Sequence, residues 1–327
     1  MNPDLPPALR QAVEALLQGV ARKGVAERAG AISARYRSGG GSAGVVISEA
    51  DAAAYALTRL PATYAAGLRA MTEAALRAPA FSPRSLLDAG AGPGGAAWAA
   101  LETWPQIEAV ARLDSNPAFL ELAARLAADG PDPLRRAQAL RGDLTAQGVW
   151  PTSDLVVASY ALAEIPPARQ AEVVSALWTA CEGVLVLVEP GTPDGWRRIL
   201  QARETVLAAG AALLAPCPHA AACPVAAPDW CHFSQRLPRS REHRLAKGGD
   251  APFEDEKFAY LAAARPQIGV APPAPRVLSP PRAAKPGITL KLCTPEGELA
   301  ARFVARRDKA AHAAARRLDW GGALPTA

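Results

Sequence analysis

The sequence predicts an α/β fold built on a doubly wound parallel sheet. From residue 84 onward, short β-like runs alternate with helical runs, which is the order of βαβ units whose helices cover a parallel sheet. The first of these strands leads into a glycine-rich turn directly before a helix, and the next strand ends in an acid. Together these observations indicate a Rossmann-like fold with its ligand beyond the carboxyl ends of the strands.

Five strands and four helices can be placed along this region. Helices are expected from about 94, near 117–128, near 167–180 and at about 194–209, each between two β-like runs or after the last one. The expected strands are, in chain order, SLLDAG at 85–90, IEAVARLD at 107–114, ALRGD at 139–143, DLVVASY at 154–160 and GVLVLVEPG at 183–191.

The region before the sheet is predicted to be helical. Residues 5–22 and 48–77 have the composition and spacing of helices. Ser48, with Asp51 three positions on, forms a plausible capping pair at the start of the second run. We therefore expect an N-terminal helical region.

The pattern changes after residue 209. A stretch rich in cysteine, proline and histidine is followed by an acidic-to-apolar run at 254–264, which we expect to be a helix, and by a proline-rich connector at 266–286. The runs ITLKLC at 288–293 and LAARFVA at 299–305 predict an antiparallel hairpin that completes the sheet, with a basic helix behind it. The expected units are a helical region at 1–80, a Rossmann-like domain at 81–209 and 254–327, and an insertion at 210–253.

Composition and charge limit the classes of function. The chain has 327 residues and a formal net charge of +5. It offers no run of the roughly 18 uncharged apolar residues that a membrane span needs, and its acidic, proline-containing start is unlike an export signal, so we expect a cytoplasmic protein without a membrane partner. The basic residues gather at 232–249 and 301–317. Such surfaces suit a polyanion such as RNA, although a solvated helix face accounts equally well for the second run.

The glycine-rich turn is the first candidate site. Glycines at 90, 92 and 94 let the backbone approach a ligand closely, and the helix that follows offers unpaired N–H groups. Asp114 ends the second strand, where an acid accepts hydrogen bonds from ribose hydroxyls. The glycine loop is a weak signal alone, and the acid makes it more specific.

The cysteines form the second candidate site. Five cysteines without an export signal argue against a disulfide framework. Cys217, Cys223 and Cys231 lie in one loop-like stretch, and Cys293 ends a late strand. Four thiolates can hold zinc or an iron–sulfur cluster, and the spacing alone leaves both open. Cys181 is the fifth, and we expect it to be a small core residue.

The loop region resembles class I methyltransferases, which use S-adenosylmethionine. The string DAGAGPG, followed by RLDSN, is similar to the first two motifs of that superfamily. The resemblance implies contacts to the methionine part of the cofactor from the glycine loop, to ribose from Asp114 and to adenine from Asp143, for which a simple turn acid is an equal alternative. The implied cofactor residues are Asp88, Gly90, Gly92, Gly94, Asp114, Asp143 and Ser159.

No catalytic residue follows from that resemblance. The segment SYALAEIP at 159–166 lacks the element that positions an amino nucleophile and also lacks a Pro-Cys nucleophile. The catalytic residues are therefore unknown at this point. Tyr160 and Glu164 are the first candidates for positioning a substrate, because they follow the fourth strand.

A second resemblance is more specific. The strings EPGTPDGWRRI, CPH, CP, DWCHFSQR and FEDEKFAYLAAAR, followed by LCTPEG, are similar to the signature of methyltransferase-like proteins that associate with the small subunit of the mitochondrial ribosome and have bacterial relatives. The resemblance covers roughly residues 84–320. It implies a 4Fe-4S cluster on Cys217, Cys223, Cys231 and Cys293, and the small ribosomal subunit and its rRNA as partners of a chain that is monomeric away from the ribosome.

Two functions remain open under this resemblance. The chain methylates small-subunit rRNA, or it is a non-catalytic assembly factor that keeps the cofactor pocket; an ordinary methyltransferase with a structural zinc site is the third alternative. Trp230, His232 and Phe233 are candidates to stack on unpaired bases, and packing around the cluster is an equal alternative for Trp230. The residues expected to contact rRNA phosphate are Arg236, Arg239, Arg241, Arg244 and Lys247.

Overall fold

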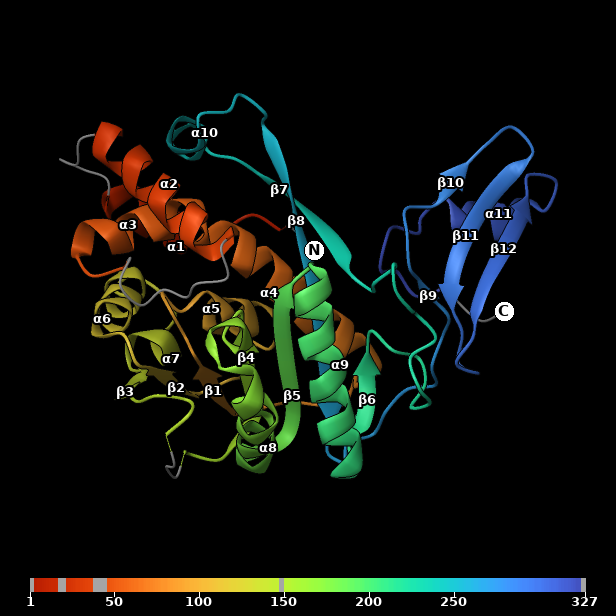
Figure 1. Cartoon of the computed structure of the whole chain (residues 1–327), viewed down its shortest axis with the longest axis horizontal. Coiled ribbons are helices and arrows are strands. Elements are labelled where there is room, and N and C mark those ends of the chain that lie inside the picture. The colour runs from red at the N-terminus through yellow and green to blue at the C-terminus, as the bar shows by residue number, and fades with distance from the viewer. Residues whose placement is uncertain (1–2, 17–21, 38–45, 147–149, 325–327) are drawn as a thin grey trace.

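The computed structural model describes residues 3–16, 22–37, 46–146 and 150–324. None of the helices within these ranges has the length and apolar character of a membrane span. Helices precede the central sheet and lie together on one side of the molecule (Figure 1). They are α1 (Pro7–Leu16), α2 (Arg22–Arg37), α3 (Glu49–Thr58) and α4 (Leu60–Arg77).

The start of α3 follows the predicted capping pattern. The Ser48 side chain accepts a hydrogen bond from the Asp51 N–H at 3.2 Å, and the Asp51 carboxylate accepts one from the Ser48 N–H at 3.1 Å. The predicted run 48–77 is divided into two helices, because α3 ends at Thr58 and Pro61 lies in the first turn of α4. Helix α2 is an addition to the predicted pair, since its apolar residues do not form one clear stripe.

An eight-stranded sheet forms the centre of the molecule (Figure 1). The five predicted strands are confirmed and pair in parallel, whereas the strands that join after them are antiparallel. Across the sheet the order is β3 (Gln138–Arg141), β2 (Ala109–Asp114), β1 (Ser85–Ala89), β4 (Ser153–Ser159), β5 (Cys181–Pro190), β8 (Phe253–Ala264) and β6 (Ala212–Ala215), with β7 (Phe233–Pro238) also pairing with β8.

Helices cover both faces of this sheet, which confirms the doubly wound, Rossmann-like architecture. Leu86 and Leu155 point to the face covered by α4 and α5, while Leu87 and Val156 point to the face covered by α8 and α9. The strand order reverses between β1 and β4, and open α/β sheets bind their ligands in the crevice beyond the carboxyl ends of strands at such a switch point. The helices between the parallel strands are α5 (Gly95–Thr103), α6 (Pro117–Leu126), α7 (Asp132–Arg135), α8 (Gln170–Ala180) and, after β5, α9 (Pro193–Ala208).

The helix predicted for residues 254–264 is wrong, because this segment is strand β8. It lies antiparallel between β5 and β6, with Val188 opposite Tyr260 and Ala212 opposite Ala264. Its second half, FAYLAAA, is buried throughout. The hydrogen bonds of two neighbouring strands and burial on both faces override the helix propensity of alanine.

Strands β7 and β8 extend beyond the sheet as a hairpin that carries helix α10 (Arg241–Lys247) between them. We call residues 233–254 the arm, and Figure 1 shows α10 beside α2. The stretch 210–253, predicted as an insertion, contributes β6 and β7 to the central sheet. Between these two strands runs the cysteine loop, residues 216–232.

The last part of the chain forms a sheet of its own, which we call the C-terminal sheet (residues 276–324). The predicted hairpin is present, but it does not complete the central sheet, because β8 and β6 already occupy that side of β5. Instead it packs on α11 around a small separate core. The elements are β9 (Arg276–Val277), β10 (Arg282–Ala283), β11 (Gly287–Cys293), β12 (Leu299–Ala305) and α11 (Lys309–Ala315).

Candidate functional site

The glycine loop after β1 adopts a backbone that requires glycine. Gly90, Gly92 and Gly94 have φ values of 71°, 51° and 83°, in the left-handed region that other residues rarely occupy. The N–H groups of Gly90 and Ala91 donate to the Leu113 carbonyl at 2.8 and 3.0 Å, which ties the loop to the end of β2. Helix α5 begins directly after the loop.

Asp114 connects the end of β2 to the glycine loop after β1. One carboxylate oxygen accepts a hydrogen bond from the Gly92 N–H at 2.7 Å, and the other accepts one from the Asn116 N–H at 2.8 Å. Burial raises the pKa of Asp114, while these backbone N–H groups oppose the rise. Each carboxylate oxygen has a second lone pair, so the acid can hold the loop and still accept a hydroxyl donor.

Asp88 lies beneath the glycine loop. It is completely buried, and one of its oxygens accepts a hydrogen bond from the Ala97 N–H in the first turn of α5 at 3.1 Å. The other oxygen has no hydrogen-bond partner among the described residues. Burial raises its pKa to about 7, with a smaller opposing effect from Arg112. Asp88 thus stabilises the start of α5 by accepting this backbone hydrogen bond.

Asp143 follows β3 and Ser159 ends β4, and β2 and β1 lie between these two strands in the sheet. Asp143 accepts hydrogen bonds from the Thr145 N–H at 2.7 Å and from the Thr145 hydroxyl at 2.8 Å, which is the geometry of a turn acid. The Ser159 hydroxyl is buried at the end of β4 without a partner among the described residues. Local turn chemistry is therefore enough to explain Asp143.

Tyr160 has an unusual backbone at the end of β4. Its φ is 60°, which is strained for a tyrosine, and its N–H donates to the Val188 carbonyl at 2.7 Å. Its hydroxyl donates to the Glu256 carboxylate of β8 at 2.7 Å. Strain of this kind at a strand end is common in functional sites, so the geometry supports the selection of Tyr160.

A cavity of about 1370 Å³ lies beside Tyr160, between α2, α3, the ends of β4 and β5, and the arm. Glu164 and several basic side chains line it. Among the basic side chains, Arg59, Arg198 and Lys257 were not predicted from the sequence, whereas Arg239 and Lys247 were predicted as RNA contacts. The buried Glu189 carboxylate accepts a hydrogen bond from Arg198 at 2.5 Å, and burial raises its pKa to about 7. The basic lining residues are Arg59, Arg198, Arg239, Lys247 and Lys257.

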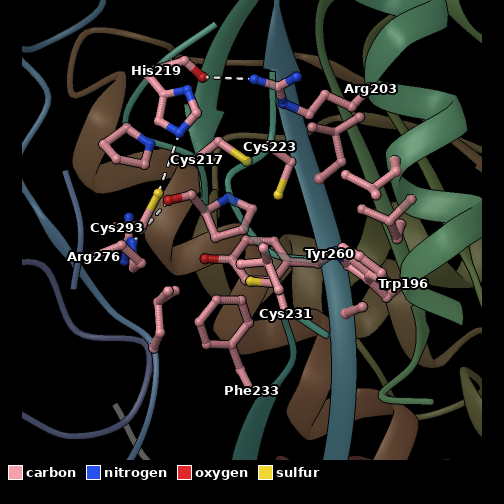
Figure 2. A pocket seen from close by; sticks show the side chains of 18 residues that line it. Trp196, Arg203, Cys217, His219, Cys223, Cys231, Phe233, Tyr260, Arg276 and Cys293 are labelled. Carbon is pink, nitrogen blue, oxygen red and sulfur yellow. Dashed lines mark hydrogen bonds between the residues drawn. The ribbon is translucent and has the colours of Figure 1, made fainter. Parts of the chain in front are cut away.

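The four predicted cysteine ligands line a different cavity, which we call the thiol cavity. Figure 2 shows the sulfur atoms of Cys217, Cys223 and Cys231 from the cysteine loop and Cys293 from β11 around one space. Each is a free thiol, as is Cys181, which is buried in β5 away from this cavity. Residues 76 positions apart thus meet where the C-terminal sheet joins the rest of the molecule.

Burial is the main cause of the raised pKa values of three of these thiols. It raises the pKa of Cys217, Cys231 and Cys293, the last to about 12, and the neighbouring thiols raise each of them further. Within the described ranges, no group of three or more His, Cys, Asp or Glu side chains is arranged to hold a metal ion. An iron–sulfur cluster on these four cysteines is therefore a proposal and not an observation.

Two buried arginines flank the thiol cavity. Arg203 of α9 donates to the carbonyls of His219 and Ala221 in the cysteine loop, at 2.9 and 2.6 Å. Arg276 of β9 donates to the Glu73 carboxylate at 2.5 Å, and its strand position is opposite Cys293. Spacing along the chain gives no signal for either residue.

His219 also points into the cavity. A ring nitrogen lies 3.3 Å from the Cys293 sulfur, and burial lowers the histidine pKa (Figure 2). Trp230 and His232 stack on each other with ring centroids 5.0 Å apart, and the Trp230 indole donates to the Gly191 carbonyl at 3.0 Å. Phe233 is 2% exposed, so its predicted role as a base-stacking residue is wrong; it packs in the core.

The predicted RNA-contact residues all lie on the arm. Glu254 of β8 accepts hydrogen bonds from Arg239 at 2.9 Å and from Lys247 at 2.8 Å, and Arg236 pairs with Asp255 at 2.8 Å. These three cations are therefore already partnered by acids of the same hairpin. The remaining two, Arg241 and Arg244, lie on α10.

Comparison with known proteins identifies the family. The family model described as mitochondrial small ribosomal subunit Rsm22 matches residues 49–325. The chain belongs to the Rsm22 family. A human relative of this Rsm22 chain, ribosome assembly protein METTL17, mitochondrial, is 31% identical in an alignment of 294 residues that covers 83% of this chain and 62% of that protein. The Rsm22-cox11 tandem proteins 1 and 2 of Schizosaccharomyces pombe are 25% identical in alignments of 324 residues that cover 83% of this chain and 43% of theirs.

Two of the solved structures that resemble part of this chain are methyltransferases. Magnesium protoporphyrin IX methyltransferase of Synechocystis PCC 6803 with bound SAM has a TM-score of 0.41 and 14% identity, covering 63% of the Rsm22 chain and 84% of its own. Precorrin-6y C5,15-methyltransferase of Geobacter metallireducens has a TM-score of 0.39 and 17% identity, covering 61% and 85%. These scores carry no weight for substrate, and the family assignment rests on the sequence relatives.

Proposed function

We propose that this Rsm22-family chain assists assembly of the small ribosomal subunit in the cytoplasm, with S-adenosylmethionine in the glycine-loop crevice and a 4Fe-4S cluster in the thiol cavity. The observation that carries the proposal is the thiol cavity, because three cysteines of the cysteine loop and one of β11 face one space. The human relative is named as a ribosome assembly protein, which supports a role of this chain in ribosome assembly.

The residues around the thiol cavity suit an iron–sulfur cluster. Thiolates are its usual ligands, and Cys217, Cys223, Cys231 and Cys293 would hold it. When bound, such a cluster supplies a metal–thiolate cross-link whose binding free energy contributes to folding. The guanidinium groups of Arg203 and Arg276 would balance its negative charge, and Arg203 fixes the cysteine loop through two carbonyls. A single zinc ion on the same thiols is the alternative occupant.

The crevice at β1 suits S-adenosylmethionine. The left-handed glycines have no Cβ atoms of their own at three positions of the loop, and Asp114 lies at the end of β2 with unused lone pairs for ribose hydroxyls. The start of α5 adds the positive end of a helix dipole. Asp88 stabilises this site by accepting a hydrogen bond from the Ala97 N–H at the start of α5.

Methylation of rRNA is the second candidate function. The cavity of about 1370 Å³ beside Tyr160 favours it, because it is open to a nucleotide and is lined by cations. Within the described residues, however, the tyrosine hydroxyl is committed to Glu256, and the segment 159–166 carries no recognisable nucleophile-positioning element. We therefore place assembly first.

Anaerobic purification with iron, sulfide and zinc analysis tests the cluster. About four irons and four sulfides per chain are expected, with loss of both in Cys223→Ser and retention in Cys181→Ser, whose buried thiol lies outside the cavity. One zinc without sulfide would reject the cluster. Co-sedimentation of the holoprotein with purified small subunits tests the ribosomal role, and absence from that fraction would reject it.

A further inference from the structure

The C-terminal sheet has an open face that the sites above do not use. On β11 and β12, side chains such as Leu290 and Val304 point toward α11, which lies behind these strands in Figure 1. The opposite face meets the cysteine loop at one end, where Cys293 lines the thiol cavity and Lys291 pairs with Asp229. At the other end, about four residues or roughly 14 Å along β11, the face is exposed.

Phe303 is the central residue of this open end. Its side chain is 55% exposed. A Cβ atom built on Gly287 would lie 2.7 and 2.9 Å from two atoms of the Phe303 ring, so the ring lies directly over the glycine backbone. One side of the ring is therefore packed, which limits its motion, and the other side is left to solvent. Leu299, at 43% exposure, is a second exposed apolar side chain on this face.

Basic residues surround Phe303. Arg282 and Phe303 pair with the same residue of β11 from opposite sides, which places them in one row across the sheet. Lys285 lies in the turn between β10 and β11, and the Arg306 N–H donates to the Pro286 carbonyl at 2.9 Å, which brings Arg306 to the same end. All three cationic residues are exposed, and no ion pair to them occurs within the described part of the chain.

The positive charge of the chain is concentrated in the C-terminal sheet (residues 276–324). Residues 276–324 contain ten Lys and Arg and four Asp and Glu, a net charge of +6. The whole chain carries +5, so everything outside this unit sums to −1. The arm contrasts with it, because three of its five predicted RNA-contact cations are paired with Glu254 or Asp255.

We propose that the open face of the C-terminal sheet binds an unpaired RNA segment, with a base stacked on the Phe303 ring and flanking phosphates held by Arg282, Lys285 and Arg306. Aromatic rings displayed on a sheet beside cations are a recurrent way to bind single-stranded RNA without reading its sequence. An acidic peptide would use the cations but would leave the ring without a stacking partner. The proposal rests on the proposed ribosomal role and narrows its partner to single-stranded rRNA.

Fluorescence anisotropy of the full-length holoprotein with a labelled, non-self-complementary 12-nucleotide RNA tests this surface. Stacking of one base is worth about 1–3 kcal/mol, so Phe303→Leu is expected to weaken binding by about 5-fold to 150-fold, whereas Phe303→Trp retains it. Leucine still covers Gly287, so the melting temperature is expected to change little. Arg282→Ala with Arg306→Ala is expected to lower the slope of log K against log salt by about 1.4.

The matched charge control lies on the other side of the same unit. Arg316 and Arg317, exposed at the end of α11, lose the same two charges on alanine substitution and are expected to affect binding less. Unchanged affinity in Phe303→Leu, or equal competition by polyglutamate, would overturn the proposal. If the wild type sediments with small subunits but Phe303→Leu binds RNA normally, this inference fails and the ribosomal role stands; if the wild type does not sediment, the ribosomal role fails.

Discussion

Replacing Arg276 with methionine is expected to loosen the junction between the C-terminal sheet and α4. Arg276 is 2% exposed, and it donates to the Glu73 carboxylate at 2.5 Å, to the Gly321 carbonyl at 2.6 Å and to the Pro216 carbonyl at 3.0 Å. Methionine keeps most of the side-chain volume but removes all three hydrogen bonds. The change in stability therefore measures the contribution of these polar contacts, with little change in packing.

The size of the effect follows from burial. Removing one partner of a buried ion pair costs roughly 3 to 5 kcal/mol. We expect the lower end, about 3 kcal/mol, because Arg69 remains 3.2 Å from Glu73 and keeps part of its compensation. At about 2 °C for each kcal/mol in a chain of this size, the melting temperature is expected to fall by roughly 6 °C.

Thermal melting followed by circular dichroism measures this loss, and hydrogen exchange locates it. Faster exchange is expected across β9 and β11, while β1 and β4 keep their protection. Arg302→Met is the control, since Arg302 is exposed on β12 and its loss is expected to change stability by less than about 0.5 kcal/mol. A fall of the same size in both variants, or no fall in Arg276→Met, would refute the role of the buried pair.

Three further changes test the central sheet. Because the folded pKa of Asp88, about 7, lies above its ordinary value of 3.8, its contribution to stability is present below about pH 4 and is lost as pH rises through 7. Asp88→Asn is therefore expected to melt higher than the wild type at pH 8, with the difference disappearing toward pH 4. Gly92→Ala is expected to weaken S-adenosylmethionine binding in calorimetry, whereas Gly210→Ala, with a similar left-handed backbone far from the crevice, costs about 1 kcal/mol of stability without that loss. Tyr160→Phe removes the hydrogen bond to Glu256 and is expected to cost about 1.5 kcal/mol in denaturant unfolding, with cofactor affinity unchanged.

The sequence predicted what depends on local pattern. The five parallel strands and the capping pair at Ser48 are confirmed, because apolar period and capping chemistry act over a few neighbouring residues. The glycine-rich turn before a helix was also predicted, and its left-handed backbone, which few other residues adopt, is a finding of the structure.

What the sequence did not predict depends on distant contacts. FAYLAAA in β8 has the composition of a helix, and only its place between β5 and β6 makes it a strand. The hairpin at 288–305 was correctly predicted, but its own core with α11 removed it from the central sheet. Glu73 and Arg276 are 203 positions apart, so no sequence spacing signals their contact. The acids that pair with the arm's cations belong to a segment predicted as helix.

The order of the cysteines along the chain has a consequence for synthesis. Cys231 precedes Cys293 by 62 residues, so a nascent chain exposes three of the thiols well before the fourth is made. Because Cys293 ends β11, the set is complete only when the C-terminal sheet has folded and packed against α4 through Arg276. A chain truncated before residue 276 keeps three thiols on a loop and lacks both the fourth cysteine and the positively charged C-terminal sheet that carries it. In a full-length chain whose C-terminal sheet has not docked, the fourth thiol is present but separated from the other three.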